Sequence, residues 1–131
     1  MTDLAPGLSA ARTFIVSDAD TAKALGSGSL RVLATPRLLA WSESVTCAAI
    51  QNALAAGSTS VGARVSLEHM APTAVGDEVR VGATVTVVDG RALTFEVEAS
   101  DVAGATVARG EIVRAVVGAE TFMARLGPDH R

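Results

Sequence analysis

The sequence predicts an α+β domain in which an antiparallel β-sheet wraps around one long central helix. Two observations carry this prediction: a single long helical stretch begins near residue 35, and four stretches with strand character follow it. The chain has 131 residues, of which 49% are hydrophobic and 19% are charged. That size and apolar content suit one packed domain, so we expect a single domain over residues 1–131.

The first half of the chain supplies the helix. We expect residues 1–10 to form a loose arm and residues 12–16 to form a first strand. Thr35 and Pro36 mark the start of the long helix, because threonine is a good N-cap and proline suits the first turn. Gly57 is a stop signal, and the helix is expected over residues 36–55.

The second half of the chain supplies the sheet. Apolar residues alternate with polar ones, as in half-buried strands, over residues 61–68, 79–87, 93–99 and 106–117. Asp89 and Gly90 give a strong hairpin signal, and Gly110 is a candidate β-bulge. The long helix is the only large element that could cover the apolar face of this meander, which gives a two-layer α+β arrangement.

Composition and charge exclude several classes of function. The net charge is −3 and no basic stripe is present, so we expect no nucleic-acid partner, which would require a positive surface. No stretch approaches the roughly 20 apolar residues of a membrane span, and we expect no membrane association. Cys47 is the only cysteine, which precludes an intrachain disulfide and suits a reducing compartment. We therefore expect a cytoplasmic protein.

Glu43 interrupts an apolar seam of the predicted helix. The seam is formed, by its three-four spacing, from Ala40, Cys47, Ile50 and Leu54. A carboxylate there would be partly desolvated, which suits a general base that acts near neutral pH. Alternatively, the seam is only half-buried and Glu43 pairs with an arginine. Cys47 in such a seam is interpreted as inert packing.

His69 and Thr35 are two further candidates. His69 shares the odd-numbered face of its strand with Val65 and Leu67, so we expect it to point toward the side of the sheet that the helix covers. There it is either a core residue or a catalyst. Thr35 is either a simple N-cap or part of a site at the helix N-terminus, where free N–H groups can stabilise an oxyanion. With one inward histidine and no cysteine pair, we expect no metal site.

Several of these residues together resemble a known family. From about Phe14 to Leu126 the chain is similar to the hotdog-fold acyl-CoA thioesterases of the fluoroacetyl-CoA thioesterase type. The resemblance rests on Thr35-Pro36, Glu43 eight residues after the threonine, the run from Gly62 to His69, Pro72 and Gly76. It implies a hotdog fold and hydrolysis of a small acyl-CoA thioester to the free acid and coenzyme A. Coenzyme A is then part of the substrate, and no cofactor is implied.

The resemblance also implies the residues of the site. Thr35, Glu43 and His69 match the catalytic Thr–Glu–His set of the family. Gly62 matches a position where the backbone lies close to the acyl group, and Arg114 matches a basic, substrate-binding position on the last strand. Glu43 either attacks the carbonyl or activates a water, and Thr35 is either a nucleophile or an aligning group. The family further implies a homodimer, or a dimer of dimers, with active sites at the subunit interface.

Other interpretations compete with hydrolysis. A non-catalytic acyl-CoA-binding module of the same fold would bind esters without cleaving them, and a purely structural partner protein would do neither. A hotdog hydratase resembles this chain less, because its aspartate is followed five residues later by a histidine, whereas Asp20 is followed at that spacing by Leu25. The segment of residues 25–34 is short and has no aromatic residue, whereas the corresponding segment of the fluoroacetyl-specific enzymes is longer and rich in aromatic residues. We therefore expect a different acyl specificity.

Overall fold

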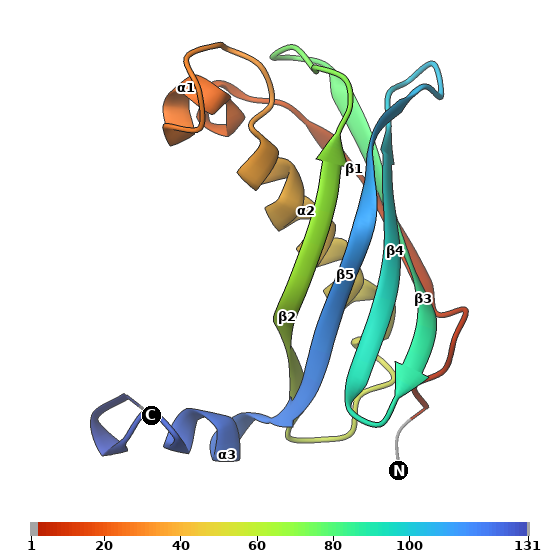
Figure 1. Ribbon diagram of the computed structural model, residues 1–131, viewed down its shortest axis with the longest axis vertical. Coiled ribbons are helices and arrows are strands. Elements are labelled where there is room, and N and C mark those ends of the chain that lie inside the picture. The colour runs from red at the N-terminus through yellow and green to blue at the C-terminus, as the bar shows by residue number, and fades with distance from the viewer. Residues whose placement is uncertain (1–2, 131) are drawn as a thin grey trace.

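The computed structural model describes residues 3–130 and contains a five-stranded sheet with one long helix beside it (Figure 1). The strands are β1 (Ser9–Ile15), β2 (Ser58–His69), β3 (Glu78–Asp89), β4 (Ala92–Ser100) and β5 (Thr106–Gly118). The α-helices are α1 (Ala22–Leu25), α2 (Thr35–Ile50) and α3 (Ala119–Ala124). Two short 3₁₀ turns cover Asp18–Asp20 and Pro128–His130.

Neighbouring strands are antiparallel throughout, in the order β1-β3-β4-β5-β2. The edges of the sheet are therefore β1 and β2, and β2 is a long edge strand of 12 residues. The predicted hairpin is present but shifted by one residue, because Asp89 pairs with Ala92 and the loop is Gly90 and Arg91. Gly90 has a φ of 59°, a left-handed conformation that glycine adopts without a steric penalty.

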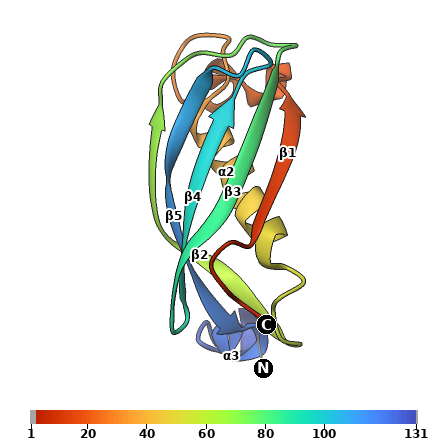
Figure 2. The same cartoon turned by 90° about the vertical axis from the view of Figure 1, so that its right-hand side faces the viewer.

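α2 crosses one face of the sheet and packs chiefly on β1 and β3 (Figure 1, Figure 2). Its buried residues are Leu38, Ser42, Val45, Thr46 and Ile50. They meet a core from the sheet that consists mostly of β-branched and aliphatic residues. Phe95 is the largest buried side chain in it. Among residues 3–130, no helix is both long enough and apolar enough to cross a membrane.

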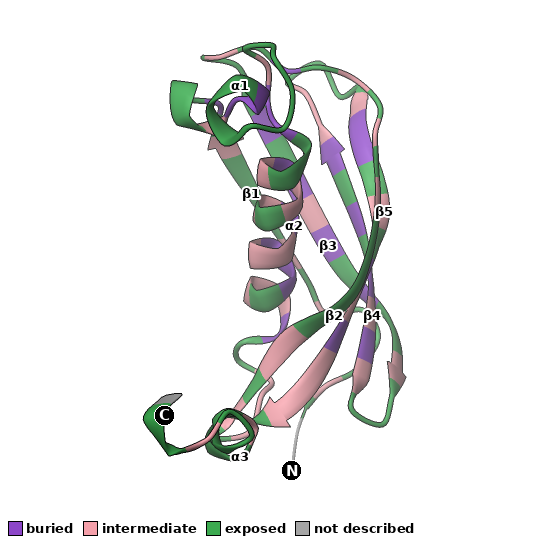
Figure 3. Ribbon diagram, turned by 60° about the vertical axis from the view of Figure 1, so that its left-hand side comes forward, coloured by how far each residue is buried: buried purple, intermediate pink, exposed green. Residues whose placement is uncertain are grey.

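The packed face of α2 differs from the predicted seam. Ala40 and Cys47 of the predicted seam are exposed, and its member Ile50 is fully buried together with Leu38 and Val45. Figure 3 shows the buried part of α2 turned toward the sheet and exposed residues along its outer side. Leu38 and Val45 lie on the side of this helix that packs on the core of the sheet, whereas Ala40 and Cys47 lie on nearly the opposite side. Ala40 and Cys47 are one turn before and after Glu43, whose carboxylate lies against Gly62 of β2. The helix also ends at Ile50, earlier than residue 55.

Two further expectations are corrected by the structure. The arm is not loose as far as residue 10, because β1 begins at Ser9 and Gly7 donates a backbone hydrogen bond to Val85. Gly110 is not a bulge, since it pairs in register with neighbours on both sides. A side chain there would collide with the carbonyl oxygen of Ser66, which explains the glycine. On β2 the register shift instead lies between Gly62 and Arg64.

Candidate active site

Thr35 and His69 meet at the N-terminal end of α2. Thr35 is the first residue of the helix and His69 the last residue of β2. The hydroxyl oxygen of Thr35 lies 2.7 Å from Nδ1 of His69. The N-cap position is occupied by Ala34, and no side chain caps the helix there. The hydroxyl of Thr35 is therefore free of the capping role predicted for it and is engaged with the imidazole instead.

The surroundings of His69 favour a neutral imidazole. Burial lowers the pKa of His69 below its ordinary value of 6.5, and the nearby backbone of Ala71 opposes this shift in part. Nε2 is buried and has no hydrogen-bond partner among the described residues. A neutral imidazole with one nitrogen held by Thr35 and the other unpaired can accept or pass on a proton near neutral pH.

Glu43 lies farther along α2, against the middle of β2. Its Oε2 is 3.2 Å from Nη1 of Arg114, and its side chain remains 37% exposed. A β-carbon placed on Gly62 would come within 2.6 Å of the same Oε2. Glu43 is therefore half-exposed and paired with an arginine, Arg114, as one of the two interpretations of the sequence predicted. The absence of a side chain at Gly62 is what lets the carboxylate approach the strand.

Arg114 on β5 is buried, with a side-chain exposure of only 7%. Its Nε donates to Oγ of Ser60 at 2.9 Å, and its Nη2 donates to the carbonyl oxygen of Ser60 at 3.1 Å. Its third contact is the ion pair with Glu43. The guanidinium is thus turned toward protein partners, and direct contact of Arg114 with substrate stays a prediction from the family resemblance.

Within one chain, the predicted site residues form two separate groups. Thr35 and His69 form one group, and Glu43 lies with Arg114 and Gly62 in the other. Thr35 and Glu43 are eight residues apart, which corresponds to about 12 Å of helix rise. Among the described residues, no hydrogen bond or ion pair joins the two groups.

A hollow of about 270 Å³ adjoins the first group. Its walls come from the segment before α2 and from the chain after β2, and they are mostly small or aliphatic. The lining residues are Ala22, Ser27, Val32, Leu33, Thr35, His69, Met70, Ala71 and Pro72. This composition suits a short, uncharged group next to the Thr35–His69 pair.

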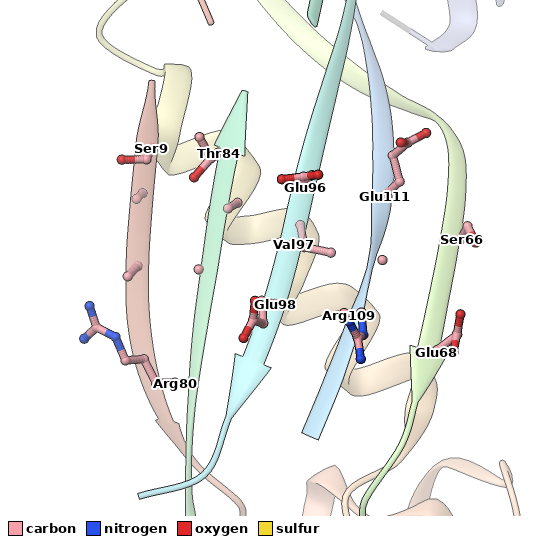
Figure 4. Close-up of a pocket in the computed structure, with 15 residues that line it drawn as sticks. Ser9, Ser66, Glu68, Arg80, Thr84, Glu96, Val97, Glu98, Arg109 and Glu111 are labelled. Carbon is pink, nitrogen blue, oxygen red and sulfur yellow. The ribbon is translucent and has the colours of Figure 1, made fainter. Parts of the chain in front are cut away.

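A larger hollow, of about 810 Å³, lies elsewhere. Figure 4 shows it on the face of the sheet turned away from α2, with Glu96, Glu98, Glu111, Arg80 and Arg109 along the strands. Thr35, Glu43 and His69 do not line it. The smaller hollow is the stronger candidate for chemistry, because a hydroxyl and an imidazole are hydrogen-bonded to each other beside it, and size alone does not define a site. Among the described residues, no group of three His, Cys, Asp or Glu side chains could hold a metal ion.

Ser60 is the member of the site that the sequence reading missed. It lies two residues before Gly62 on β2, and strand alternation places both on the same face. A short polar residue on that face next to a glycine was the available signal. The pattern could not supply the contact between Ser60 and Arg114, because it joins residues 54 positions apart on two strands.

Comparison with known proteins assigns the chain to a family. The family model described as fluoroacetyl-CoA-specific thioesterase matches residues 16–120. A solved mutant of the fluoroacetyl-CoA-specific thioesterase FlK is 26% identical to this chain, with a TM-score of 0.87 over 96% of this chain and 97% of that one. A hot-dog-like protein from Thermanaerovibrio acidaminovorans is 26% identical, with a TM-score of 0.84 over 92% of this chain and 89% of that one. Among curated protein sequences, none matches this chain.

The fold is confirmed by these structures. A thioesterase superfamily member from Thermus thermophilus, 23% identical, superposes with a TM-score of 0.89 over 96% of this chain and 93% of that one. The antiparallel sheet and its single long helix are thus the hotdog fold predicted from the sequence. The family match spans most of the chain and includes Thr35, Glu43, Gly62, His69 and Arg114. The chain therefore belongs to the fluoroacetyl-CoA-specific thioesterase family and is a thioester hydrolase.

Proposed function

We propose that this chain hydrolyses a short acyl-CoA thioester to the free acid and coenzyme A. The observation that carries the proposal is the hydrogen bond between Thr35 and His69 beside the small hollow at the N-terminus of α2. A mutant of the related thioesterase FlK has been solved in complex with fluoroacetate and CoA. That complex supports a coenzyme A ester as the class of substrate.

The carbonyl oxygen of the thioester would lie at the N-terminus of α2. No side chain caps this end of the helix among the described residues, so N–H groups of the first turn are available, apart from Pro36, which has none. Together with the positive end of the helix dipole, these groups can stabilise the oxyanion of a tetrahedral intermediate. This requires no group beyond the chain's own backbone.

Glu43 and His69 would carry the proton chemistry. Glu43 either attacks the carbonyl carbon, forming an anhydride as the carbon–sulfur bond breaks, or removes a proton from an attacking water. In the first route, water then hydrolyses the anhydride and restores the carboxylate. In the first route neutral His69 takes up the proton of the water that hydrolyses the anhydride, and in the second it takes up the proton that Glu43 removed from water; in both it delivers this proton to the expelled thiolate of coenzyme A. The role of Thr35 is to align the imidazole through its bond to Nδ1.

A second copy of the chain would bring the two groups of residues together. β2 is an edge strand that pairs with β5 on one side and with no described strand on the other. Val65 near its middle is 44% exposed. The exposed residues Ala40 and Cys47 lie one turn before and after Glu43, which meets Gly62 on this strand. A long edge strand with apolar residues is a template for pairing with another strand. We propose that two copies pair antiparallel along β2, which makes a homodimer.

The position of the two-fold axis follows from the residues that must meet. In a two-fold pairing, each residue of one copy faces a fixed partner in the other, and the relation is reciprocal. An axis through Ser66, with the irregularity between Gly62 and Arg64 taking up one extra residue, places His69 of each copy opposite Gly62 of the other. The Thr35–His69 pair of one copy then approaches Glu43 of its partner, which completes two equivalent sites per dimer.

The proposal is tested by offering the purified protein a panel of acyl-CoA esters and measuring release of free thiol. We expect turnover to be highest for short acyl groups, because the hollow is small and its lining is aliphatic. In the Glu43→Gln variant, turnover should fall by about 10²–10⁴-fold, the usual contribution of a general acid or base. Binding of the esters without hydrolysis by the wild type would instead identify a non-catalytic acyl-CoA-binding module.

A further inference from the structure

We propose that Ser60 is a positioning residue that acts on Glu43 through Arg114. The inference rests on the function proposed above and adds a residue to which the family resemblance gives no role. It starts from the burial of Arg114, which is 6% exposed. A buried guanidinium requires partners for its charge and for its N–H groups. Among the described residues, the only carboxylate that pairs with it is Glu43.

Ser60 binds Arg114 at two points. Its side-chain Oγ accepts from Nε at 2.9 Å, and its backbone oxygen accepts from Nη2 at 3.1 Å. Ser60 pairs with Val116 across the strands, so Arg114 is its diagonal neighbour, within reach of a long side chain. Because the guanidinium is planar and rigid, two fixed N–H groups on one edge determine where the remaining edge points.

That remaining edge determines where the carboxylate of Glu43 lies. Nη1 of Arg114 contacts Oε2 at 3.2 Å. Gly62 leaves room for Oε2 on the other side, where even a methyl group would not fit. Oε1 makes no hydrogen bond with any of the described residues. One oxygen is therefore anchored and the other is left for the carbonyl carbon or for a water.

Loss of the Ser60 hydroxyl should therefore affect turnover more than binding. Without the contact to Nε, only the bond from Nη2 to the backbone of Ser60 holds the guanidinium on β2, so the guanidinium can turn. The carboxylate of Glu43, which pairs with it, then loses its fixed direction. A misplacement of about 1 Å at a reacting group can reduce a rate by about 10²-fold. One of the two Ser60 contacts survives in Ser60→Ala, because it comes from the backbone. We therefore expect a smaller effect, a loss of about 10-fold in kcat.

The experiment measures kcat and KM for Ser60→Ala, Ser60→Thr and the double variant Ser60→Ala/Glu43→Gln, with the best ester of the panel. Ser9→Ala on the opposite edge strand, an exposed serine without a side-chain hydrogen bond among the described residues, is the matched control. Ser60→Ala should lower kcat about 10-fold with KM within about twofold, and Ser60→Thr should restore it. In the Glu43→Gln background, Ser60→Ala should cause no further loss, since both changes act on one group.

The outcomes separate the two proposals. Full kcat in Ser60→Ala, or a loss that multiplies with that of Glu43→Gln, would overturn the positioning role while leaving the thioesterase proposal intact. A loss in Ser60→Ala that Ser60→Thr does not restore would overturn it too. If the wild type hydrolyses no ester at all, the proposed function fails first and the role of Ser60 fails with it.

Discussion

Gly62 and Glu43 are fitted to each other across the interface between β2 and α2. A β-carbon at Gly62 would lie 2.6 Å from Oε2 of Glu43, closer than real non-bonded contacts allow. The φ of Gly62 is not positive, so the backbone itself does not require glycine there. The glycine is required because the carboxylate occupies the space of a side chain. Its role in the site is therefore to admit Glu43, in addition to any contact with the acyl group.

Gly62→Ala should impair activity more than it impairs folding. The added methyl group pushes away the end of a half-exposed side chain, which can move, so we expect a loss of stability below about 1 kcal/mol. The displaced carboxylate should reduce kcat by about 10–100-fold. Steady-state kinetics and urea unfolding measure the two effects on the same sample.

Gly82→Ala is the matched control for that variant. A β-carbon at Gly82 on β3 would meet only the carbonyl oxygen of Ala10, at 3.9 Å, an ordinary contact. Gly82→Ala should therefore keep full activity. If both variants lose activity equally, the effect comes from glycine replacement in the sheet, and the proposed fit between Gly62 and Glu43 is wrong.

Thr35→Val should reduce turnover, because it removes the hydroxyl that holds Nδ1 of His69 and preserves the shape of the side chain. Thr35→Ser keeps the hydroxyl and should retain most of the activity. Thr35 does not cap α2, so neither variant should show the loss of about 1 kcal/mol typical of a removed N-cap. Thermal unfolding alongside kinetics checks both statements, and a normal kcat in Thr35→Val would exclude the aligning role.

The lowered pKa of His69 gives the stability of the protein a defined dependence on pH. Because burial lowers this pKa below 6.5, the folded protein binds a proton at His69 less readily than the unfolded chain does. The stability that the protein has while His69 is neutral is fully present above about pH 6.5. It is lost as the pH falls from there toward the lower pKa that His69 has in the folded state. The acid limb of kcat/KM should likewise have an apparent pKa below 6.5, since the neutral imidazole is the active form.

Urea unfolding of the wild type and of His69→Asn at about pH 7.5 and about pH 5 tests the stability part. Between these values the wild type should lose more stability than His69→Asn, whose side chain does not titrate. An equal loss in both proteins would assign the acid sensitivity to other groups.

The fold could be predicted from the sequence because its signals are local and agree with one another. Alternation from Val79 to Val87 and the turn at Gly90 determine the meander, and Pro36 marks the first turn of the helix. The site could be predicted only in part. The contact between Thr35 and His69 joins residues 34 positions apart, and the ion pair between Glu43 and Arg114 joins residues 71 positions apart. No local pattern encodes distances across the sheet.

The error about the helix seam has a physical explanation in the proposed dimer. Ala40 and Cys47 carry the apolar pattern of a buried stripe, yet both are exposed in the single chain. They flank Glu43 on the side of α2 next to β2, the edge along which we propose that the second copy pairs. A sequence records burial in the assembly as well as in the monomer, so a stripe covered by a partner cannot be told from a core stripe by its spacing.

The most direct test of a shared site is complementation between two defective chains. Glu43→Gln and His69→Ala are co-expressed with different affinity tags, the mixed dimer is isolated, and thiol release is compared with that of each parent and of the wild type. In the mixed dimer, one site receives both defects and the other receives none. We therefore predict about half of the wild-type turnover per dimer, with both parents nearly inactive. Turnover of the mixed dimer no higher than that of its parents would contradict a site built from Glu43 of one copy and His69 of the other.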